Sequence, residues 1–156
     1  MIVITLKEIN QAINNKIKAA IKDTDYETVP ILVSDLSTTE RPSIKVEIEK
    51  VTSGMYNSNC RERQIMPKIY FYASTLENYK VENLEIHDLL SNEFLIGIEI
   101  EENFSIPVSD FKGEVKDTIL ECSFNLETIE NIPEELLDGK KYEVMEELNV
   151  NLKEEK

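Results

Sequence analysis

The hydrophobic positions between residues 6 and 21 recur every three or four residues, which predicts an amphipathic helix. Ile9, Ile13 and Ile17 form the centre of its apolar stripe. Thr5 and Glu8 have the spacing of a capping box, in which each side chain accepts a hydrogen bond from the other residue's backbone N–H. The first predicted element is therefore a helix that packs one face against the rest of the chain.

Further along, apolar and polar residues alternate, as they do in half-buried strands. The segments 43–51, 61–73 and 117–129 show this pattern, and residues 52–59 carry the glycine and asparagines of a turn. A shorter apolar run covers 29–34. Proline has no backbone N–H to donate, so Pro30 predicts an edge strand, and Pro67 predicts an edge or a bulge.

A second helix is expected at 79–91, and two short strands around a turn at 94–114, with Gly97 as a bulge. After Pro133 we expect a short helix and an acidic tail. The pattern predicts an α+β fold in which an antiparallel sheet of about five to six strands has both main helices packed on one face. Residues 1–132 would form one domain, and residues 133–156 a C-terminal extension. The apolar arc expected on the second helix consists of Val81, Leu84, Ile86, Leu89 and Leu90.

The charge balance argues against two classes of partner. The chain has 17 Lys and Arg against 31 Asp and Glu, a net charge of -14 over 156 residues. Such a protein repels phosphate backbones and anionic lipid surfaces, so we expect neither sequence-specific nucleic-acid binding nor membrane binding. No apolar run approaches the roughly 20 residues of a membrane span, and no signal peptide is recognisable.

Catalytic, cofactor and metal sites are not indicated. Cys60 and Cys122 form no CxxC pair and are expected to be reduced thiols. None of the 4 glycines lies in a phosphate-binding motif, and no metal-ligand spacing occurs. A Cys60–His87 dyad would require the fold to bring the two residues together. We therefore expect a protein that is not an enzyme and holds no cofactor.

Arg61 and Arg63 stand out in this acidic chain because they precede the apolar part of one strand with the same two-residue spacing. Three interpretations remain open. The arginines could pair with Glu47 or Glu49 across the hairpin, contact nucleic acid, or contact an acidic face of another copy of the chain. A subunit with an acidic body and a basic hairpin can associate with itself head to tail.

Several segments, taken in order, resemble one known family. They are "LKEINQAINNKIKAAI" (6–21), "RPSIKVEI" (41–48), "YNSNCRERQIMPKIYFYA" (56–73), "ENLEIHDLLSNEF" (82–94) and "MEELNVNL" (145–152). In their order and texture they resemble the tail terminator, or tail completion, proteins of long-tailed phages and phage-derived particles. The similarity is greatest to the branch from phages and prophages of Gram-positive bacteria.

This resemblance implies a structural virion protein with no enzymatic activity. Family members form a ring, expected to be a homohexamer, that caps the head-proximal end of the tail tube and stops its polymerisation. The implied partners are other copies of the chain, the tail tube protein, neck or head-completion proteins and, in a contractile tail, the sheath. The implied location is the tail of a phage or of a headless particle such as a bacteriocin, assembled in the host cytoplasm.

The resemblance also turns the third interpretation of the arginines into an interface hypothesis. The hairpin at 52–73 would reach the neighbouring subunit or the last tube ring, where aromatic residues and arginine are favoured contacts. A second partner-binding element is expected in the C-terminal segment, through Tyr142, Val144, Met145, Leu148 and Val150. The hairpin residues proposed for the interface are Met55, Tyr56, Arg61, Arg63, Lys68, Tyr70 and Tyr72.

Three other functions remain open from the sequence. A head-tail connector or neck protein would bind portal or adaptor proteins instead of the tube. A small hydrolase would depend on Cys60 as its nucleophile. A ligand-binding domain in the cytosol would stay monomeric in the presence of the tube.

Overall fold

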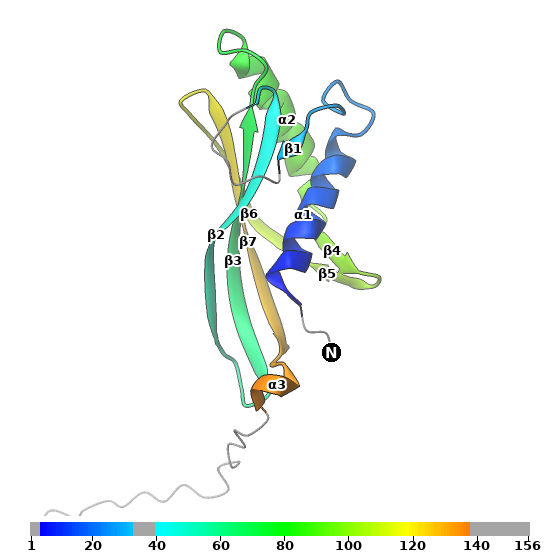
Figure 1. Ribbon diagram of the computed structural model, residues 1–156, viewed down its shortest axis with the longest axis vertical. Coiled ribbons are helices and arrows are strands. Elements are labelled where there is room, and N and C mark those ends of the chain that lie inside the picture. Colours follow the sequence, from blue (N-terminus) through cyan, green and yellow to red (C-terminus); the bar gives the residue numbers. More distant parts are fainter. Residues whose placement is uncertain (1–3, 33–39, 138–156) are drawn as a thin grey trace, which may run out of the picture.

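The structure is a computed structural model that describes residues 4–32 and 40–137 (Figure 1). Its elements in chain order are α1 (Leu6–Ile21), β1 (Ile31–Leu32), β2 (Ser43–Met55), β3 (Cys60–Tyr72), α2 (Tyr79–Phe94), β4 (Ile98–Glu101), β5 (Phe104–Ile106), β6 (Val108–Lys116), β7 (Ile119–Asn131) and α3 (Glu134–Leu137). The α+β class and the short helix after Pro133 are confirmed.

The main sheet has five strands in the order β1-β2-β3-β7-β6, and β4 pairs with β5 in a separate two-stranded sheet. β1 runs parallel to β2, and the remaining pairs of the main sheet are antiparallel. The sheet is therefore mixed, and the expectation of a purely antiparallel sheet is wrong at this edge. Alternation in a sequence indicates which face a side chain occupies and carries no information on strand direction. The edge position predicted from Pro30 is confirmed, because β1 is the outermost strand.

Both main helices pack on one face of the main sheet, as the sequence predicts (Figure 1). The capping box predicted for α1 is present, with Thr5 and Glu8 each accepting from the other's backbone N–H. Burying a large aliphatic or aromatic side chain contributes about 1.5–3 kcal/mol, so this interface accounts for much of the driving force for folding. Its fully buried side chains include Ile9, Ile13 and Ile17 of α1, Ile86, Leu90 and Phe94 of α2, and Ile65, Ile69, Phe71 and Phe124 of the sheet.

Three phenylalanines pack α2 against strands β6 and β7 of the sheet. The ring of Phe94 lies 5.0 Å from that of Phe124 and 5.9 Å from that of Phe111, measured between centroids. Phe111 and Phe124 are stacked at 5.8 Å. Aromatic pairs at such distances add to the energy of burial, so this cluster fixes α2 over β6 and β7.

The region around α2 differs from the prediction in two respects. Val81 and Leu84 are 62% and 69% exposed, so they lie outside the buried face, which instead includes Asn83. Gly97 has φ +102, and its N–H donates to the carbonyl of Phe94. It therefore ends the helical turn after α2 and is not a strand bulge. The residues expected to hold two short strands form β4, β5 and most of β6.

The hairpin of β2 and β3 is longer than predicted and extends past the two main helices (Figure 1). The pairing of β2 with β3 shifts between Ile48 and Lys50, so Glu49 is an extra residue in β2. Pro67 faces Ile48 across the strands, next to this bulge. β3 is a central strand, so the edge position predicted from Pro67 is wrong. The predicted bulge is present, but it lies in the facing strand β2.

No helix in the described ranges is long and apolar enough to cross a membrane.

Candidate interaction surfaces

The hairpin residues predicted to form an interface lie in three separate places. Arg61 and Arg63 are on the face of β3 that also carries Ile65 and turns toward the helices. Lys68, Tyr70 and Tyr72 occupy the opposite, open face of the sheet, and Met55 and Tyr56 are at the hairpin tip. One contact could not use all seven residues at once.

The arginine pair belongs to an ionic cluster built around Glu130 of β7. Nε of Arg63 lies against Oε1 of Glu130 as an ion pair, and Nε of Arg61 donates to the same oxygen at 3.2 Å. The other carboxylate oxygen accepts from the backbone N–H of Ile4 at 3.0 Å, and Nη2 of Arg63 donates to the carbonyl of Ile4 at 2.5 Å. The cluster therefore ties the chain just before α1 to the sheet.

Burial gives this cluster a structural role. The side chains of Arg63 and Glu130 are only 6% and 2% exposed, and that of Arg61 is 25% exposed. A buried charge needs a close partner of opposite sign, and Glu130 supplies it. The hypothesis that the two arginines pair with Glu47 or Glu49 is wrong, because both pair with Glu130. Arg63 is enclosed by its own chain, so it presents no free charge to another molecule.

Sequence reasoning missed Glu130, although a signal for it exists. Leu120, Cys122, Phe124 and Leu126 alternate toward the core, and the same alternation continues through Thr128 to Glu130. A glutamate at an inward position of a strand requires a cation on a neighbouring strand. Arg61 faces Glu130 in the pairing of β3 with β7.

On the open face, one lysine links β2, β3 and β7. Nζ of Lys68 lies 3.1 Å from Glu49 and 3.0 Å from Glu121, and these carboxylates raise the pKa of Lys68. The hydroxyl of Tyr70 donates to Glu49. Burial, followed by this hydrogen bond, raises the pKa of Tyr70, while the hydrogen bonds from Tyr70 and then Lys68 lower the pKa of Glu49. The open face therefore presents an ordered polar network.

Tyr72 continues this surface toward the end of β3. The guanidinium carbon of Arg41 lies 5.8 Å from the centroid of the Tyr72 ring, within cation–π distance. Arg41 also donates to the carbonyl of Ala73 at 3.1 Å, which holds it in place.

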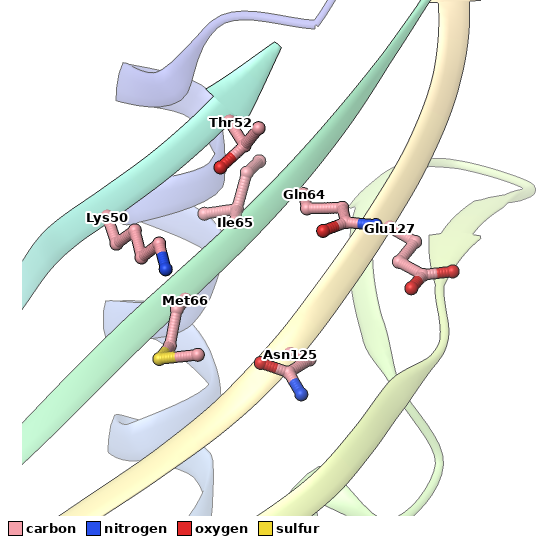
Figure 2. Close-up of a pocket in the computed structure, with 7 residues that line it drawn as sticks. All are labelled: Lys50, Thr52, Gln64, Ile65, Met66, Asn125 and Glu127. Atoms are coloured by element: carbon pink, nitrogen blue, oxygen red, sulfur yellow. The ribbon is translucent and has the colours of Figure 1, made fainter. Parts of the chain in front are cut away.

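Below the lysine network, the open face has a depression of about 200 Å³. Figure 2 shows its side chains on β2, β3 and β7, with α1 behind the sheet. Its wall is polar on both sides and includes no close set of catalytic or metal-binding groups. The residues drawn in the figure are Lys50, Thr52, Gln64, Ile65, Met66, Asn125 and Glu127.

The hairpin tip is exposed, uncharged and internally braced. Residues 51–60 contain no acidic or basic side chain, and Met55 and Tyr56 are 59% and 58% exposed. Oδ1 of Asn57 accepts from the backbone N–H groups of Asn59 and Cys60 at 2.9 and 2.8 Å. The carbonyl of Asn59 accepts from the N–H of Ile132 at 2.9 Å, which joins the tip to the end of β7. The tip therefore presents its apolar side chains from an ordered turn.

The fold separates Cys60 from His87. Cys60 begins β3 at the hairpin tip, where its thiol contacts Asn131, and His87 lies in α2 beside Gly113 of β6. The dyad considered from the sequence is therefore not assembled. Cys122 is fully buried, and burial raises the pKa of its thiol to about 12. In the described part of the chain, no group of three or more His, Cys, Asp or Glu side chains could hold a metal ion.

The second predicted partner-binding element falls mostly outside the described residues. Pro133 and α3 are described. Residues Tyr142, Val144, Met145, Leu148 and Val150 lie beyond them.

Comparison with known protein families gives a match over most of the chain. A family model described as "Phage tail terminator protein" matches residues 8–136. This stretch runs from the first turn of α1 into α3 and includes every strand of the described residues. No match was found among curated proteins.

Proposed function

The chain belongs to the phage tail terminator family, and we propose that its copies form a ring that caps the head-proximal end of a tail tube. The ring stops tube polymerisation and offers its outer side to neck or head-completion proteins and, in a contractile tail, to the sheath. The family match over residues 8–136 carries this proposal. It supports a structural role in a phage tail.

The geometry supports a role based on contact surfaces. The β2–β3 hairpin projects past the helices with a braced, uncharged tip, and the open face of the sheet carries tyrosines beside a lysine network. Ordered aromatic side chains lose little conformational freedom on binding, which favours them in interfaces. Met55 and Tyr56 at the tip are the first contact residues, and Lys68, Tyr70 and Tyr72 form the second.

Of the two arginines, only Arg61 remains in the proposed interface. It is partly exposed, whereas Arg63 is enclosed and paired with Glu130. Replacing both arginines with glutamate would place two new carboxylates beside the buried Glu130, and their repulsion would unfold the protein. The hairpin is therefore tested at its tip, where substitutions leave the core intact.

The proposal makes the chain a non-enzymatic subunit that needs no cofactor. Its ring number is six by the family expectation. The net charge of -14 suits a ring whose bore passes DNA without binding it. The C-terminal segment from residue 133 is proposed as an additional contact with neck or sheath.

The decisive experiment follows tube growth. Tail tube protein from the same phage or particle is polymerised with and without this chain, and tube lengths are measured by negative-stain electron microscopy. We expect tubes that stop growing and carry a ring at one end. Tubes that elongate at the same rate and bear no ring would refute the proposal. Binding to a portal or adaptor protein without binding to the tube would instead identify a connector.

A further inference from the structure

A second apolar surface lies at the opposite end of the molecule from the hairpin tip. It is a groove of about 510 Å³ between α2 and β6, here called the α2–β6 groove, with Leu120 of β7 also in its wall. Leu84 and Val115 at the groove are 69% and 50% exposed, so apolar side chains stay in contact with water. Its other lining residues include Tyr79, Asn83, His87 and Gly113. Figure 1 shows the start of α2 and the β6–β7 turn at one end of the sheet, and the β2–β3 tip at the other.

The shape of the groove depends on Gly113. A Cβ atom at this position would lie 2.1 Å from Cδ2 of His87, which is closer than any stable contact. The imidazole of His87 therefore lies directly on the backbone of β6. Glycine at position 113 therefore allows the His87 ring to form this part of the groove wall.

Asn83 joins the wall of the groove to the turn between β6 and β7. It is 2% exposed, and its Nδ2 donates to the carbonyl of Thr118 at 3.1 Å. Its Oδ1 is buried beneath the groove surface and accepts no hydrogen bond from any described residue. The surface that an occupant meets is therefore mainly apolar.

The turn that Asn83 contacts is a two-residue hairpin turn between β6 and β7. Asp117 and Thr118 have φ 49 and φ 72, the positive values that a type I′ turn needs at both central residues. The hydrogen bond from Asn83 thus fixes α2 to this turn at one end of the groove.

The distribution of charge favours a second copy of the chain as the occupant. Two copies that each carry a charge of -14 repel one another, so they associate best through surfaces that lack the acidic excess. The hairpin tip meets this condition, because residues 51–60 hold no charged side chain. The groove meets it too, because its lining has no carboxylate and includes one cation, Lys80.

Tyr56 matches the apolar character of the groove. Its side chain is 58% exposed, and its ring supplies apolar area for the exposed Leu84 and Val115. The turn stabilised by Asn57 presents Tyr56 in an ordered conformation, which lowers the entropic cost of binding.

We propose that the Tyr56 tip of one copy inserts into the α2–β6 groove of the next, with the Tyr56 ring packed against Leu84 and Val115. The inference rests on the proposed ring function and names the surfaces that join its subunits. Tip and groove are different surfaces, so the contact is heterologous. Each added copy leaves one tip and one groove free until the ring closes.

The test is a site-specific photo-cross-link in the full chain. Position 56 carries p-benzoylphenylalanine in place of tyrosine, and this chain is mixed with an isotope-labelled unmodified chain and tail tube protein. After irradiation, mass spectrometry locates the cross-links. We expect them on residues 79–87 and 113–115 of the labelled copy. Cross-links on the tube protein, on residues 138–156 or elsewhere on the copy would overturn the inference.

A matched pair of variants gives a second readout. Leu84→Glu puts a charge into the groove, and Leu95→Glu puts the same charge on an 80% exposed leucine just after α2. We expect Leu84→Glu to raise the concentration needed for ring formation at least tenfold and Leu95→Glu to change it less than twofold. Equal effects, or none, would overturn the inference. Rings that form and cap tubes without cross-links to the groove refute only this contact, whereas unmodified chain that never assembles with the tube refutes the proposed function as well.

Discussion

The guanidinium of Arg63 and the carboxylate of Glu130 form an ion pair in which both side chains are nearly fully buried. Glu130 also accepts hydrogen bonds from Arg61 and from the backbone of Ile4. One carboxylate thus joins β3, β7 and the residue before Thr5, the N-cap of α1. Arg61 and Arg63, which stand out in the acidic sequence, therefore stabilise the fold through Glu130.

Removing Glu130 should strongly destabilise the protein. Glu130→Ala leaves Arg63 buried without its partner, and breaking a buried pair in this way costs about 3–5 kcal/mol. Urea unfolding followed by circular dichroism measures the loss. Glu127→Ala, an exposed glutamate on the same strand, is the control and should change stability by less than about 0.5 kcal/mol. Equal stabilities for the two variants would contradict the structural role of the cluster.

Two glycines should respond differently to the same substitution. Gly113→Ala forces His87 off the backbone of β6 and should cost about 1–3 kcal/mol while changing the shape of the α2–β6 groove. Gly54→Ala meets nothing within 4 Å and should be close to neutral. Thermal unfolding measures both. A Gly113→Ala protein as stable as the unmodified one would show that His87 has room to move.

The hydrogen bond from Tyr70 to Glu49 should give a bell-shaped pH dependence. The folded protein holds the pKa of Tyr70 above its usual value of 10.0, so this contribution is present below that pH and is lost as the pH rises. It holds the pKa of Glu49 below 4.5, so that contribution is present above this value and is lost as the pH falls.

Tyr70→Phe isolates this effect. The variant should be less stable by about 1 kcal/mol near neutral pH. The difference in unfolding free energy between the two proteins should narrow at both ends of the pH range. Urea titrations between about pH 3 and pH 11 measure this difference. A difference that does not change with pH would show that the hydrogen bond contributes nothing.

The order of the hairpin tip should depend on Asn57. Asn57→Ala removes the acceptor for two backbone N–H groups and should lower stability by about 1 kcal/mol. It should also weaken ring formation several-fold, because Tyr56 would then be presented from a disordered turn. Ser58→Ala in the same turn is the control. Amide hydrogen exchange at residues 59 and 60 reports the local order, and unchanged exchange in Asn57→Ala would refute this role.

The sequence predicted those parts of the fold that depend on local pattern. The capping box of Thr5 and Glu8, the inward alternation from Leu120 to Leu126 and the helix after Pro133 are confirmed because each depends on neighbours a few residues away. Family membership, expected from the order of several such segments, is confirmed by the match over residues 8–136.

Features that depend on strand order could not be predicted in the same way. The partner of Arg63 lies on β7, and nothing in the alternation of β3 says which strand will lie beside it. The parallel pairing of β1 has the same origin. The sequence places Leu84 in the apolar arc of the second helix, and only the position of β6 shows that it borders an exposed groove.

The extra residue at Glu49 determines which side chains of β2 face the helices in the outer half of the hairpin. Before it, Ile44 and Ile48 face the helices, and after it the parity of β2 reverses, so that Val51 and Met55 lie on that side. If Glu49 were instead taken into regular pairing, Lys50, Thr52 and Gly54 would turn toward the helices, and Val51 and Met55 would turn away from them. The bulge therefore lets β2 accommodate one additional residue without exchanging the two faces of the hairpin's outer half.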